Sequence, residues 1–502
     1  MNLSRILHDV EVERIVGPTD VSVMGIEYDS RRVEAGYLFA AIAGEKLDGN
    51  RFVPDAVARG ACAILSARPA PDPPPATWIQ VAEDRGALAR TARNYYSRPD
   101  ERMQVIGITG TNGKTTVVHL LESILKSSGQ KVCALGTLTY RFGREEIRAD
   151  RTTPESVDLY RLLDRAAAEG CRQAVMEVSS HALALRRVAG LQFGAAVFTN
   201  LTRDHLDFHG DMDRYLEAKS LLFRALPEGR PAVVNLDDPA SGTLLAATRG
   251  RPVTYGFAPG ADVRLDAFQP EPSRPLRAGQ RLRLRVFGKP LGVRTSLVGR
   301  PNASNIAAAV AAASALGFDS GAIATGIESL KGVPGRLESV EMGQPFAVYV
   351  DYAHTDDALT NVLMTLRELS PRRLIVVFGC GGDRDRTKRP LMGAAAARLA
   401  DLAILTSDNP RTEDPHTILA EVERGIRSVT ESPARFRVIA DRREAIHAAL
   451  LEAGEGDAVI IAGKGHETYQ ILRDRTIPFD DREVAREALR ARIPANSGHG
   501  AH

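Results

Sequence analysis

The sequence of 502 residues has few cysteines, no large excess of either charge and no long apolar run. Its four cysteines lie far apart and form no pair with metal-ligand spacing, so free thiols in a reducing compartment are expected. They are Cys62, Cys133, Cys171 and Cys380. The 65 basic residues nearly balance the 63 acidic ones, and without a basic stripe we expect no nucleic-acid partner.

Membrane and export signals are also missing from the sequence. Nowhere do about 18 apolar residues follow one another, as a membrane-spanning helix requires. Residues 1–20 contain neither a cationic segment followed by an apolar core nor a cleavage site. We therefore expect a cytoplasmic protein with no membrane insertion, and the length predicts about three domains.

Residues 105–116 are the most informative stretch, because a short apolar run leads directly into Gly-Thr-Asn-Gly-Lys-Thr-Thr. This order predicts a strand, a phosphate-binding loop and a helix whose N-terminus faces the anion. Lys114 would bring a cation to the β and γ phosphates of ATP, and the Thr115 hydroxyl could hold Mg²⁺. The longer form of this loop has a glycine where Ile108 stands, so the loop is compressed. A turn that only joins strand to helix would need neither the lysine nor the two threonines.

The order of strand and helix patterns predicts an α/β protein of three domains. Residues 1–99 should form a small N-terminal α/β domain, and residues 100–334 a central P-loop ATP-binding domain with a mostly parallel sheet. Within the central domain, the alternating pattern of residues 281–287 predicts an antiparallel strand. Residues 335–502 should form a C-terminal Rossmann-like, doubly wound domain that ends in a disordered tail at 495–502.

Polar segments follow several predicted strands, at the edge where ligands bind in parallel sheets. They are residues 177–181 and 200–210 in the central domain, and 351–354, 381–386, 407–411 and 463–467 in the C-terminal domain. Lys219 is expected on the flank of a helix over residues 212–223. Residues 28–31 could grip a polar ligand, but taken alone they are more typical of a turn capped by an Asx side chain.

In the order and placement of these motifs the sequence resembles the Mur ligases, ATP-dependent enzymes that form amide bonds in bacterial peptidoglycan synthesis. The resemblance covers nearly the whole chain. It rests on residues 110–116, 177–181, 200, 204–210, 219, 302, 305, 336 and 351–354, which occur in the family's order. Within the family, residues 28–31, 152–154, 408–411 and 463–467 are most similar to the members that add meso-diaminopimelate to the D-glutamate of UDP-N-acetylmuramoyl-L-alanyl-D-glutamate.

The resemblance implies ATP and Mg²⁺ as cofactors and an acyl-phosphate intermediate. It implies catalytic roles for Lys114, Glu177, His205 and Lys219, with a CO₂-derived carbamate on Lys219. The implied metal ligands are Thr115, Glu177, His205 and the modified Lys219. The implied ATP contacts are Gly110, Thr111, Asn112, Gly113, Lys114, Thr115, Thr116, Asn302, Arg336 and Asp351.

The substrates implied by the resemblance are small molecules, and a monomer is expected. The nucleotide-sugar acceptor would contact Ser30, Thr152, Thr153, Ser179 and Arg187. The incoming amino acid would contact Arg384, Asp408, Asn409, Pro410, Arg411, Gly463 and Glu467. Leu185 stands where many relatives carry glutamine, so one polar contact with the acceptor is expected to be absent.

Other interpretations remain open from the sequence. A lysine-adding muramyl ligase differs only in its amino-acid pocket, and folylpolyglutamate synthase shares the chemistry but gives residues 28–31 and 408–411 no role. A P-loop switch would hydrolyse nucleotide without an amino acid, whereas a ligase would release phosphate only with acceptor and amine together. Taken alone, His205 would be satisfied by Asp204 or Asp207, and Arg411 would be a solvated loop residue.

Overall fold

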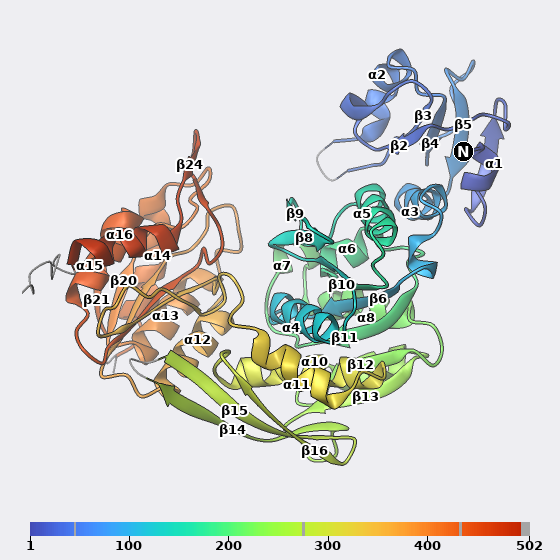
Figure 1. The fold of residues 1–502 in the computed structure, drawn as a ribbon. Coiled ribbons are helices and arrows are strands. Elements are labelled where there is room, and N and C mark those ends of the chain that lie inside the picture. The colour runs from blue at the N-terminus through green and yellow to red at the C-terminus, as the bar shows by residue number, and fades with distance from the viewer. Residues whose placement is uncertain (45–46, 274–276, 431–433, 493–502) are drawn as a thin grey trace, which may run out of the picture.

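Figure 1 shows three α/β units, with the middle unit between the other two. The first unit is blue, the middle unit runs from light blue to yellow, and the third unit is orange and red. The computed structural model describes residues 1–44, 47–273, 277–430 and 434–492. The predicted α/β class with three units is confirmed, whereas the predicted tail at 495–502 lies outside the described residues.

The first unit is built on a five-stranded sheet in the order β1-β5-β4-β3-β2. Its strands are β1 (Val12–Val16), β2 (Gly25–Glu27), β3 (Tyr37–Ala40), β4 (Ala63–Ser66) and β5 (Thr77–Val81). Only β1 runs antiparallel to its neighbour, and the remaining pairs are parallel. The helical elements are α1 (Leu3–Ile6), η1 (Ser30–Arg32), η2 (Gly49–Phe52), α2 (Val53–Ala58) and α3 (Asp84–Tyr95).

The middle unit has an eleven-stranded sheet in the order β16-β15-β14-β13-β12-β11-β6-β10-β7-β8-β9. Its parallel centre consists of β6 (Gln104–Thr109), β7 (Val132–Leu135), β10 (Gln173–Glu177), β11 (Phe193–Phe198), β12 (Pro231–Asn235) and β13 (Arg251–Gly256). One margin is formed by β8 (Thr139–Phe142) and β9 (Glu145–Arg148), the other by β14 (Val263–Ser273), β15 (Arg277–Val286) and β16 (Lys289–Thr295). The antiparallel strand predicted at 281–287 is confirmed as part of β15.

Helices cover both faces of this sheet, which is why its central strands read as unbroken apolar runs. They are η3 (Pro99–Glu101), α4 (Lys114–Ser127), α5 (Ser156–Ala168), α6 (Ser180–Ala184), α7 (Leu206–His209), α8 (Met212–Arg224), α9 (Ser241–Ala247), α10 (Arg300–Ala315) and α11 (Ser320–Ser329). Successive residues of β6 point to opposite faces, so that Ile106 packs with α4 and α10 while Val105 packs with α5 and α8. The core around Val105 continues without a break into the first unit.

The third unit has a six-stranded sheet in the order β17-β18-β22-β19-β20-β21. Its strands are β17 (Glu338–Ser339), β18 (Ala347–Asp351), β19 (Leu374–Phe378), β20 (Leu402–Leu405), β21 (Arg435–Val438) and β22 (Ala458–Ala462), and a hairpin of β23 (Tyr469–Ile471) and β24 (Thr476–Pro478) stands apart. Helices α12 (Asp356–Glu368), α13 (Lys388–Leu399), α14 (Pro415–Arg427), α15 (Arg442–Glu452) and α16 (Asp481–Arg492) cover the sheet. The doubly wound arrangement is confirmed, although β17, β23 and β24 had not been predicted.

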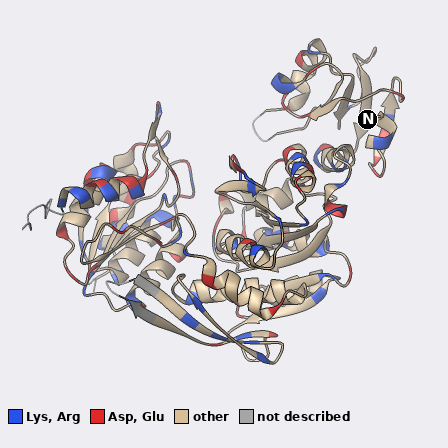
Figure 2. Ribbon diagram, viewed as in Figure 1, with Lys and Arg blue, Asp and Glu red and all other residues tan. Residues whose placement is uncertain are grey.

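Charge is distributed evenly over the three units. Figure 2 shows basic and acidic residues interspersed along the surface helices of each unit. Among the described residues, none of the helices is both long and apolar enough to span a membrane. All four cysteines are free, and three of them are buried while Cys62 is half-buried.

Candidate active site

The phosphate-binding loop follows β6, as the sequence predicts. Gly110 and Gly113 have φ angles of 143° and 87°, a left-handed backbone that other residues adopt only with strain. A Cβ on Gly113 would also overlap the side-chain oxygen of Asn305 from α10. Glycine is therefore required at Gly113 both by the turn and by the close approach of α10.

Two lysines donate to the same carbonyl oxygen in this loop. The Nζ of Lys114 lies 2.9 Å from Gly110 O and 2.7 Å from Thr111 O, and the Nζ of Lys219 lies 2.9 Å from Gly110 O. Burial lowers the pKa of both amines, and the positive charge of Lys114 lowers the pKa of Lys219 further. Two neighbouring buried ammonium groups repel each other, so the arrangement favours a neutral amine at Lys219.

The sequence-based position of Lys219 on the flank of its helix is wrong. Lys219 is 1% exposed, because α8 turns this residue inward against the phosphate-binding loop. Gly110 O supplies a hydrogen-bond acceptor there, and the Tyr215 ring lies 4.2 Å from Nζ. A buried polar contact of this kind gives no signal in the hydrophobic period of a helix.

Glu177, at the end of β10, provides an oxygen beside the loop. Its Oε1 accepts hydrogen bonds from Thr115 Oγ1 at 3.0 Å and from the Thr137 backbone N–H at 2.8 Å. Glu177 is only 1% exposed. Two oxygens held side by side suit Mg²⁺, which is usually bound by one or two protein groups together with water and phosphate oxygens. The described residues hold no cluster of three or more His, Cys, Asp or Glu that would bind a metal by itself.

His205 and its neighbours form an aromatic cluster at the ends of β10 and β11. The His205 ring lies 4.8 Å from the His181 ring, and its Nε2 lies 3.4 Å from Asp204 Oδ2. Burial lowers the pKa of His205 to about 3, although Asp204 opposes this shift. His205 is therefore neutral at pH 7, as a metal-ligating imidazole must be. His209, a member of the motif 204–210 to which the sequence analysis gave no role, contacts Ser180 Oγ at 2.9 Å.

Seven of the ten predicted nucleotide ligands meet in one cavity of about 120 Å³, named here the nucleotide cavity, whereas Gly110, Thr111 and Lys114 do not line it. Its lining includes Asn112, Gly113, Thr115, Thr116, Asn302, Arg336 and Asp351. Arg336 stacks on the Tyr352 ring at 4.8 Å, and its Nη2 lies 3.5 Å from Thr115 Oγ1. Asp351 accepts hydrogen bonds from the Leu337 and Ala353 backbone at 2.6 and 2.8 Å, while burial raises its pKa.

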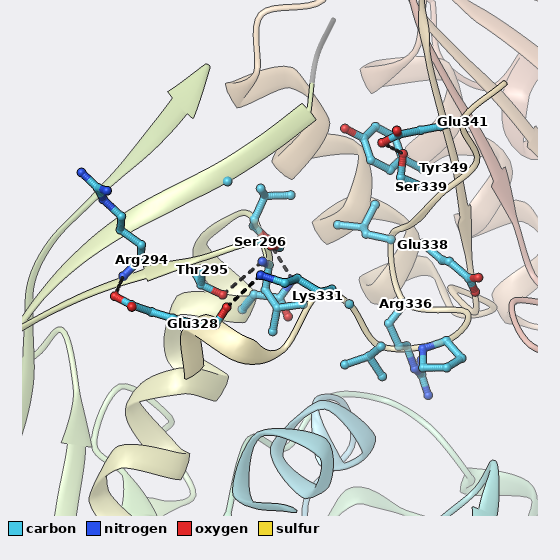
Figure 3. A pocket seen from close by; sticks show the side chains of 18 residues that line it. Arg294, Thr295, Ser296, Glu328, Lys331, Arg336, Glu338, Ser339, Glu341 and Tyr349 are labelled. Carbon is cyan, nitrogen blue, oxygen red and sulfur yellow. Dashed lines mark hydrogen bonds between the residues drawn. The ribbon is translucent and has the colours of Figure 1, made fainter. Parts of the chain in front are cut away.

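A wider cleft of about 900 Å³ opens next to the nucleotide cavity, between the middle and third units. Figure 3 shows Arg294, Glu328 and Lys331 on its middle-unit side and Glu338, Ser339 and Glu341 on the other. The two cavities share Asn302 and Arg336. Arg336 therefore lies where the two units touch, with open space beside it.

A second cavity between these units, of about 290 Å³, is named here the reaction cavity. From the middle unit it is lined by His181, Arg203, Asp204, His205 and Asp207. From the third unit it is lined by Tyr352, His354, Thr355, Asp356, Gly381, Arg384, Asp385, Lys388, Asp408, Asn409, Arg411, Gly463 and Glu467. Six of the seven predicted amino-acid ligands thus converge beside His205, whereas Pro410 does not line the cavity.

Buried arginines hold the loops that carry these ligands. Arg389 is fully buried and pairs with Glu413 and Glu421, each at 2.7 Å. Glu413 also accepts from the Asp383 backbone N–H at 2.6 Å, so it joins the loop before α13 to the loop carrying Arg411. The Arg389 side chain holds the pKa of Glu413 at about 2. Arg411 donates to Gly382 O at 2.7 Å across the same two loops.

Lys464 organises the opposite side of the reaction cavity, although the sequence analysis gave this member of the segment 463–467 no role. It is fully buried, and its Nζ donates to Asn409 Oδ1 at 3.0 Å and to Glu467 Oε2 at 2.9 Å. Asn409 in turn donates to Glu467 Oε2 at 2.8 Å. Beneath them, Arg442 pairs with Asp481 at 2.7 Å and donates to Ala462 O at 3.0 Å, just before Gly463. A lysine between two glycines at the end of an apolar strand is the signal that could have identified Lys464.

Four of the predicted acceptor ligands gather close to Glu177. Thr153 Oγ1 donates to Glu177 O at 2.9 Å and accepts from the Ser179 backbone N–H at 3.1 Å. Arg187 donates to Thr153 O at 3.3 Å, and Thr137 Oγ1 lies 3.1 Å from Thr152 Oγ1. Ser30 lies in the first unit, and no hydrogen bond between described residues joins it to this group.

The turn interpretation of residues 28–31 is confirmed. Asp29 accepts from the Arg31 backbone N–H at 3.1 Å and pairs with the Arg31 guanidinium at 2.6 Å. Tyr28 donates to Asp158 Oδ2 of α5 at 2.6 Å. Arg161 of α5 also pairs with Glu27 at 2.8 Å, so these contacts fix the first unit on the middle unit beside Ser30.

Three family models match the chain in order. The one described as "Mur ligase family, catalytic domain" matches residues 22–96, "Mur ligase middle domain" matches residues 108–313, and "Mur ligase, glutamate ligase domain" matches residues 335–465. Their division of the chain parallels the three observed units.

Individual proteins are similar over the full length. A Solibacter usitatus protein named UDP-N-acetylmuramoyl-L-alanyl-D-glutamate–2,6-diaminopimelate ligase is 49% identical over 510 residues, covering 100% of this chain and 99% of its own. One of the same name from Syntrophomonas wolfei is 44% identical, covering 98% and 100%. A solved structure of a protein with that name has a TM-score of 0.69 at 34% identity, covering 98% and 99%. With such relatives matching from end to end, the chain belongs to the Mur ligase family.

Proposed function

We propose that this chain is the ATP-dependent ligase that adds meso-2,6-diaminopimelate to the D-glutamate of UDP-N-acetylmuramoyl-L-alanyl-D-glutamate. The observation that carries this proposal is the reaction cavity, where His205 and Asp204 face Arg411, Asn409 and Glu467. The full-length similarity to proteins named for this reaction supports it. We place the reaction in the cytoplasm, as a step of peptidoglycan precursor synthesis, and propose that a monomer performs it.

The reaction requires activation, because an oxygen of a carboxylate is a poor leaving group. The carboxylate oxygen of D-glutamate attacks the γ phosphorus of ATP, and the bond to the β-phosphate oxygen breaks to release ADP. The neutral amine then attacks the acyl carbon, the bond from carbon to the phosphate oxygen breaks, and a proton leaves the nitrogen. Transfer between anionic groups depends on positioning and on charge neutralisation.

The nucleotide cavity accounts for ATP binding in this proposal. Gly110 to Thr116 surround the phosphates, and Lys114 moves from its loop carbonyls to phosphate oxygens. Asn302, Arg336 and Asp351 contact the remainder of the nucleotide from both sides of the cavity. Thr115 and Glu177, whose oxygens lie 3.0 Å apart, fit Mg²⁺, with His205 near the acyl group. Mg²⁺ would supply charge neutralisation at the transferring phosphate.

We further propose that Lys219 carries a carbamate. Its buried nitrogen with a lowered pKa is suited to react with CO₂, because only the neutral amine is a nucleophile. The modification would replace one of two adjacent cations by an anion beside the metal position. Intact mass of freshly purified protein should show the added carboxyl group, and Lys219→Ala should lose activity that acetate partly restores. An unmodified amine in protein that is actively turning over would contradict this.

The remaining roles follow the placement of the units. We assign residues 1–99 to binding the nucleotide end of the acceptor, residues 100–334 to ATP and residues 335–502 to the amino acid. Ser30 would contact the nucleotide end, and Thr152, Thr153, Ser179 and Arg187 the peptide. In the reaction cavity, Arg384 and Arg411 would bind the distal carboxylate of diaminopimelate, while Asp408, Gly463 and Glu467 accept from its ammonium.

The test is phosphate release with ATP, acceptor and one amino acid at a time. We expect release with meso-diaminopimelate and little with lysine or glutamate. A preference for lysine would leave the ligase assignment but overturn the substrate. A preference for glutamate with a folate acceptor would indicate a folylpolyglutamate synthase, and hydrolysis of ATP without any amino acid would indicate a nucleotide switch.

A further inference from the structure

Four basic side chains line the reaction cavity, and three of them already have partners. Arg203 of the middle unit lies 3.4 Å from Asp385 and also contacts Thr387 Oγ1. Arg384 and Arg411 each donate to a backbone carbonyl, of Asp383 at 3.2 Å and of Gly382 at 2.7 Å. Lys388 differs, because it makes no hydrogen bond or ion pair within the described part of the chain.

Lys388 is held close to the middle unit. It is the first residue of α13 and directly follows Thr387, the residue that Arg203 contacts from the other unit. The next residue, Arg389, is anchored to Glu413 and Glu421, so the backbone at Lys388 is fixed on both sides. The Lys388 side chain is half-buried and lines the cavity that contains Asp204 and His205.

An ordinary structural ion pair does not account for this lysine. The carboxylates of Asp204, Asp356 and Asp385 line the same cavity, yet Lys388 pairs with none of them. Lys388 thus presents an unneutralised cation to the cavity that the middle unit lines with Asp204 and His205.

We propose that Lys388 is a further catalytic residue, which binds the phosphoryl oxygens of the acyl phosphate while the amine displaces phosphate. This role rests on the proposed function and adds a residue to it. As the bond from the acyl carbon to the phosphate oxygen breaks, its electron pair passes to that oxygen. Phosphate takes up the proton lost by the amine and departs as HPO₄²⁻. A cation placed in advance at the departing oxygens stabilises that charge.

The position of Lys388 explains why the third unit must supply this cation. Lys114 approaches from the loop side, where its Nζ donates to Gly110 O. Lys388 approaches from the opposite unit, together with the amino-acid ligands Arg411 and Glu467. The acyl phosphate would therefore contact Lys388 only when the third unit, which binds the amine, is in place.

The test compares Lys388→Met and Lys388→Arg with the parent enzyme, with Lys289→Met at the exposed start of β16 as control. We expect Lys388→Met to lower kcat about a hundredfold. Its KM for the amino acid and its melting temperature should stay near the parent values, and Lys388→Arg should recover part of the rate. In single turnovers with hydroxylamine, Lys388→Met should still form ADP and should yield more trapped hydroxamate than the parent.

Three outcomes would overturn the proposal. They are a kcat within threefold of the parent, a loss confined to KM for the amino acid, and loss of ADP formation in the single turnover. The second would assign Lys388 to a carboxylate of the amino acid, and the third to nucleotide binding. Parent activity with diaminopimelate tests the proposed function separately, because the ratio of variant to parent is measured with whichever amino acid the parent uses.

Discussion

The nucleotide cavity and the reaction cavity are built in different ways. At the nucleotide cavity, four lining residues come from one continuous segment, residues 110–116, and two glycines shape it. At the reaction cavity, the residues proposed to bind the amino acid follow β19, β20 and β22, on loops held by Arg389, Lys464 and Arg442. The first cavity is thus specified largely by local sequence, whereas the second depends on contacts between distant segments. Changes at the first site should affect the rate with every amino acid, and changes at the second should affect selectivity.

The largest effect is expected at the nucleotide cavity. Lys114→Ala should raise the activation free energy by about 3 to 4 kcal/mol, because one cation at the transferring phosphate is lost. This would lower kcat by a factor of several hundred. The loss should be equal for every amino acid accepted, as measured by phosphate release. The matched control is Lys126→Ala near the end of the same helix, where the lysine pairs with Glu122. Activity of Lys114→Ala within threefold of the parent would refute its assignment to ATP.

A somewhat smaller and more selective effect is expected at the reaction cavity. Arg411→Ala should lower kcat/KM for diaminopimelate, with a loss of about 2 to 3 kcal/mol of binding free energy, because a desolvated carboxylate loses its charged partner. Lysine use should change little, since removing the cation builds no site for the uncharged end of lysine. The measurement is kcat/KM for both amino acids, with exposed Arg424→Ala as control. Unchanged diaminopimelate use would show that Arg411 does not bind it.

The network behind the reaction cavity gives a finer test. Glu413→Gln should raise KM for diaminopimelate about tenfold, because weaker contacts to Arg389 and Asp383 loosen the loop that carries Arg411. KM for ATP should stay constant. Glu421→Gln is the matched control, since Glu421 contacts the same arginine from within α14. It should lower the melting temperature without raising KM, and equal KM changes in both variants would argue against a specific role of the loop.

The smallest effect concerns pH and the helix that follows the phosphate-binding loop. Burial lowers the pKa of His119 in α4 to about 4, below its ordinary value near 6.5. The unfolded chain therefore takes up the proton first as pH falls, and stability decreases between pH 6.5 and pH 4. The loss from pH 7 to 5.5 should be about 1 kcal/mol.

His119→Gln should remove this contribution, so that parent and variant differ in the pH dependence of the unfolding free energy. Denaturant unfolding at pH 7 and pH 5.5 measures it, with exposed His416→Gln as control. Identical pH dependence in the parent and in His119→Gln would show that His119 is not the group responsible.

Local patterns were sufficient to predict much of the fold and the loop that follows β6. The strand, loop and helix around Gly110 follow from short-range rules, because glycine conformation and apolar period act within a few residues. The convergence of polar strand ends also followed, since parallel strands share one ligand-binding edge. The sequence could indicate that Arg411 and His205 approach each other only through the family's order of motifs.

Long-range polar contacts were beyond the reach of these rules. The burial of Lys219 depends on Gly110 O, 109 residues away, and hydrophobic period places such a residue on the surface. Lys464 and Arg389 are fully buried charges that each have a partner on another loop, Asn409 and Glu413 respectively. The contact of Asn112 with Asp357, at 3.0 Å between two units, likewise has no local signal. These contacts shape the site without any local signal in the sequence.

The shared apolar core between the first two units has a consequence for how the chain moves. Leu38 and Leu65 of the first unit belong to the same cluster as Val105 and Leu163 of the middle unit. The clusters of the third unit contain only its own residues among those described, and polar contacts such as Arg203 with Asp385 join it to the middle unit. Segments that share a core unfold together, whereas polar interfaces permit relative motion. The first two units are therefore expected to move as one body and the third as another.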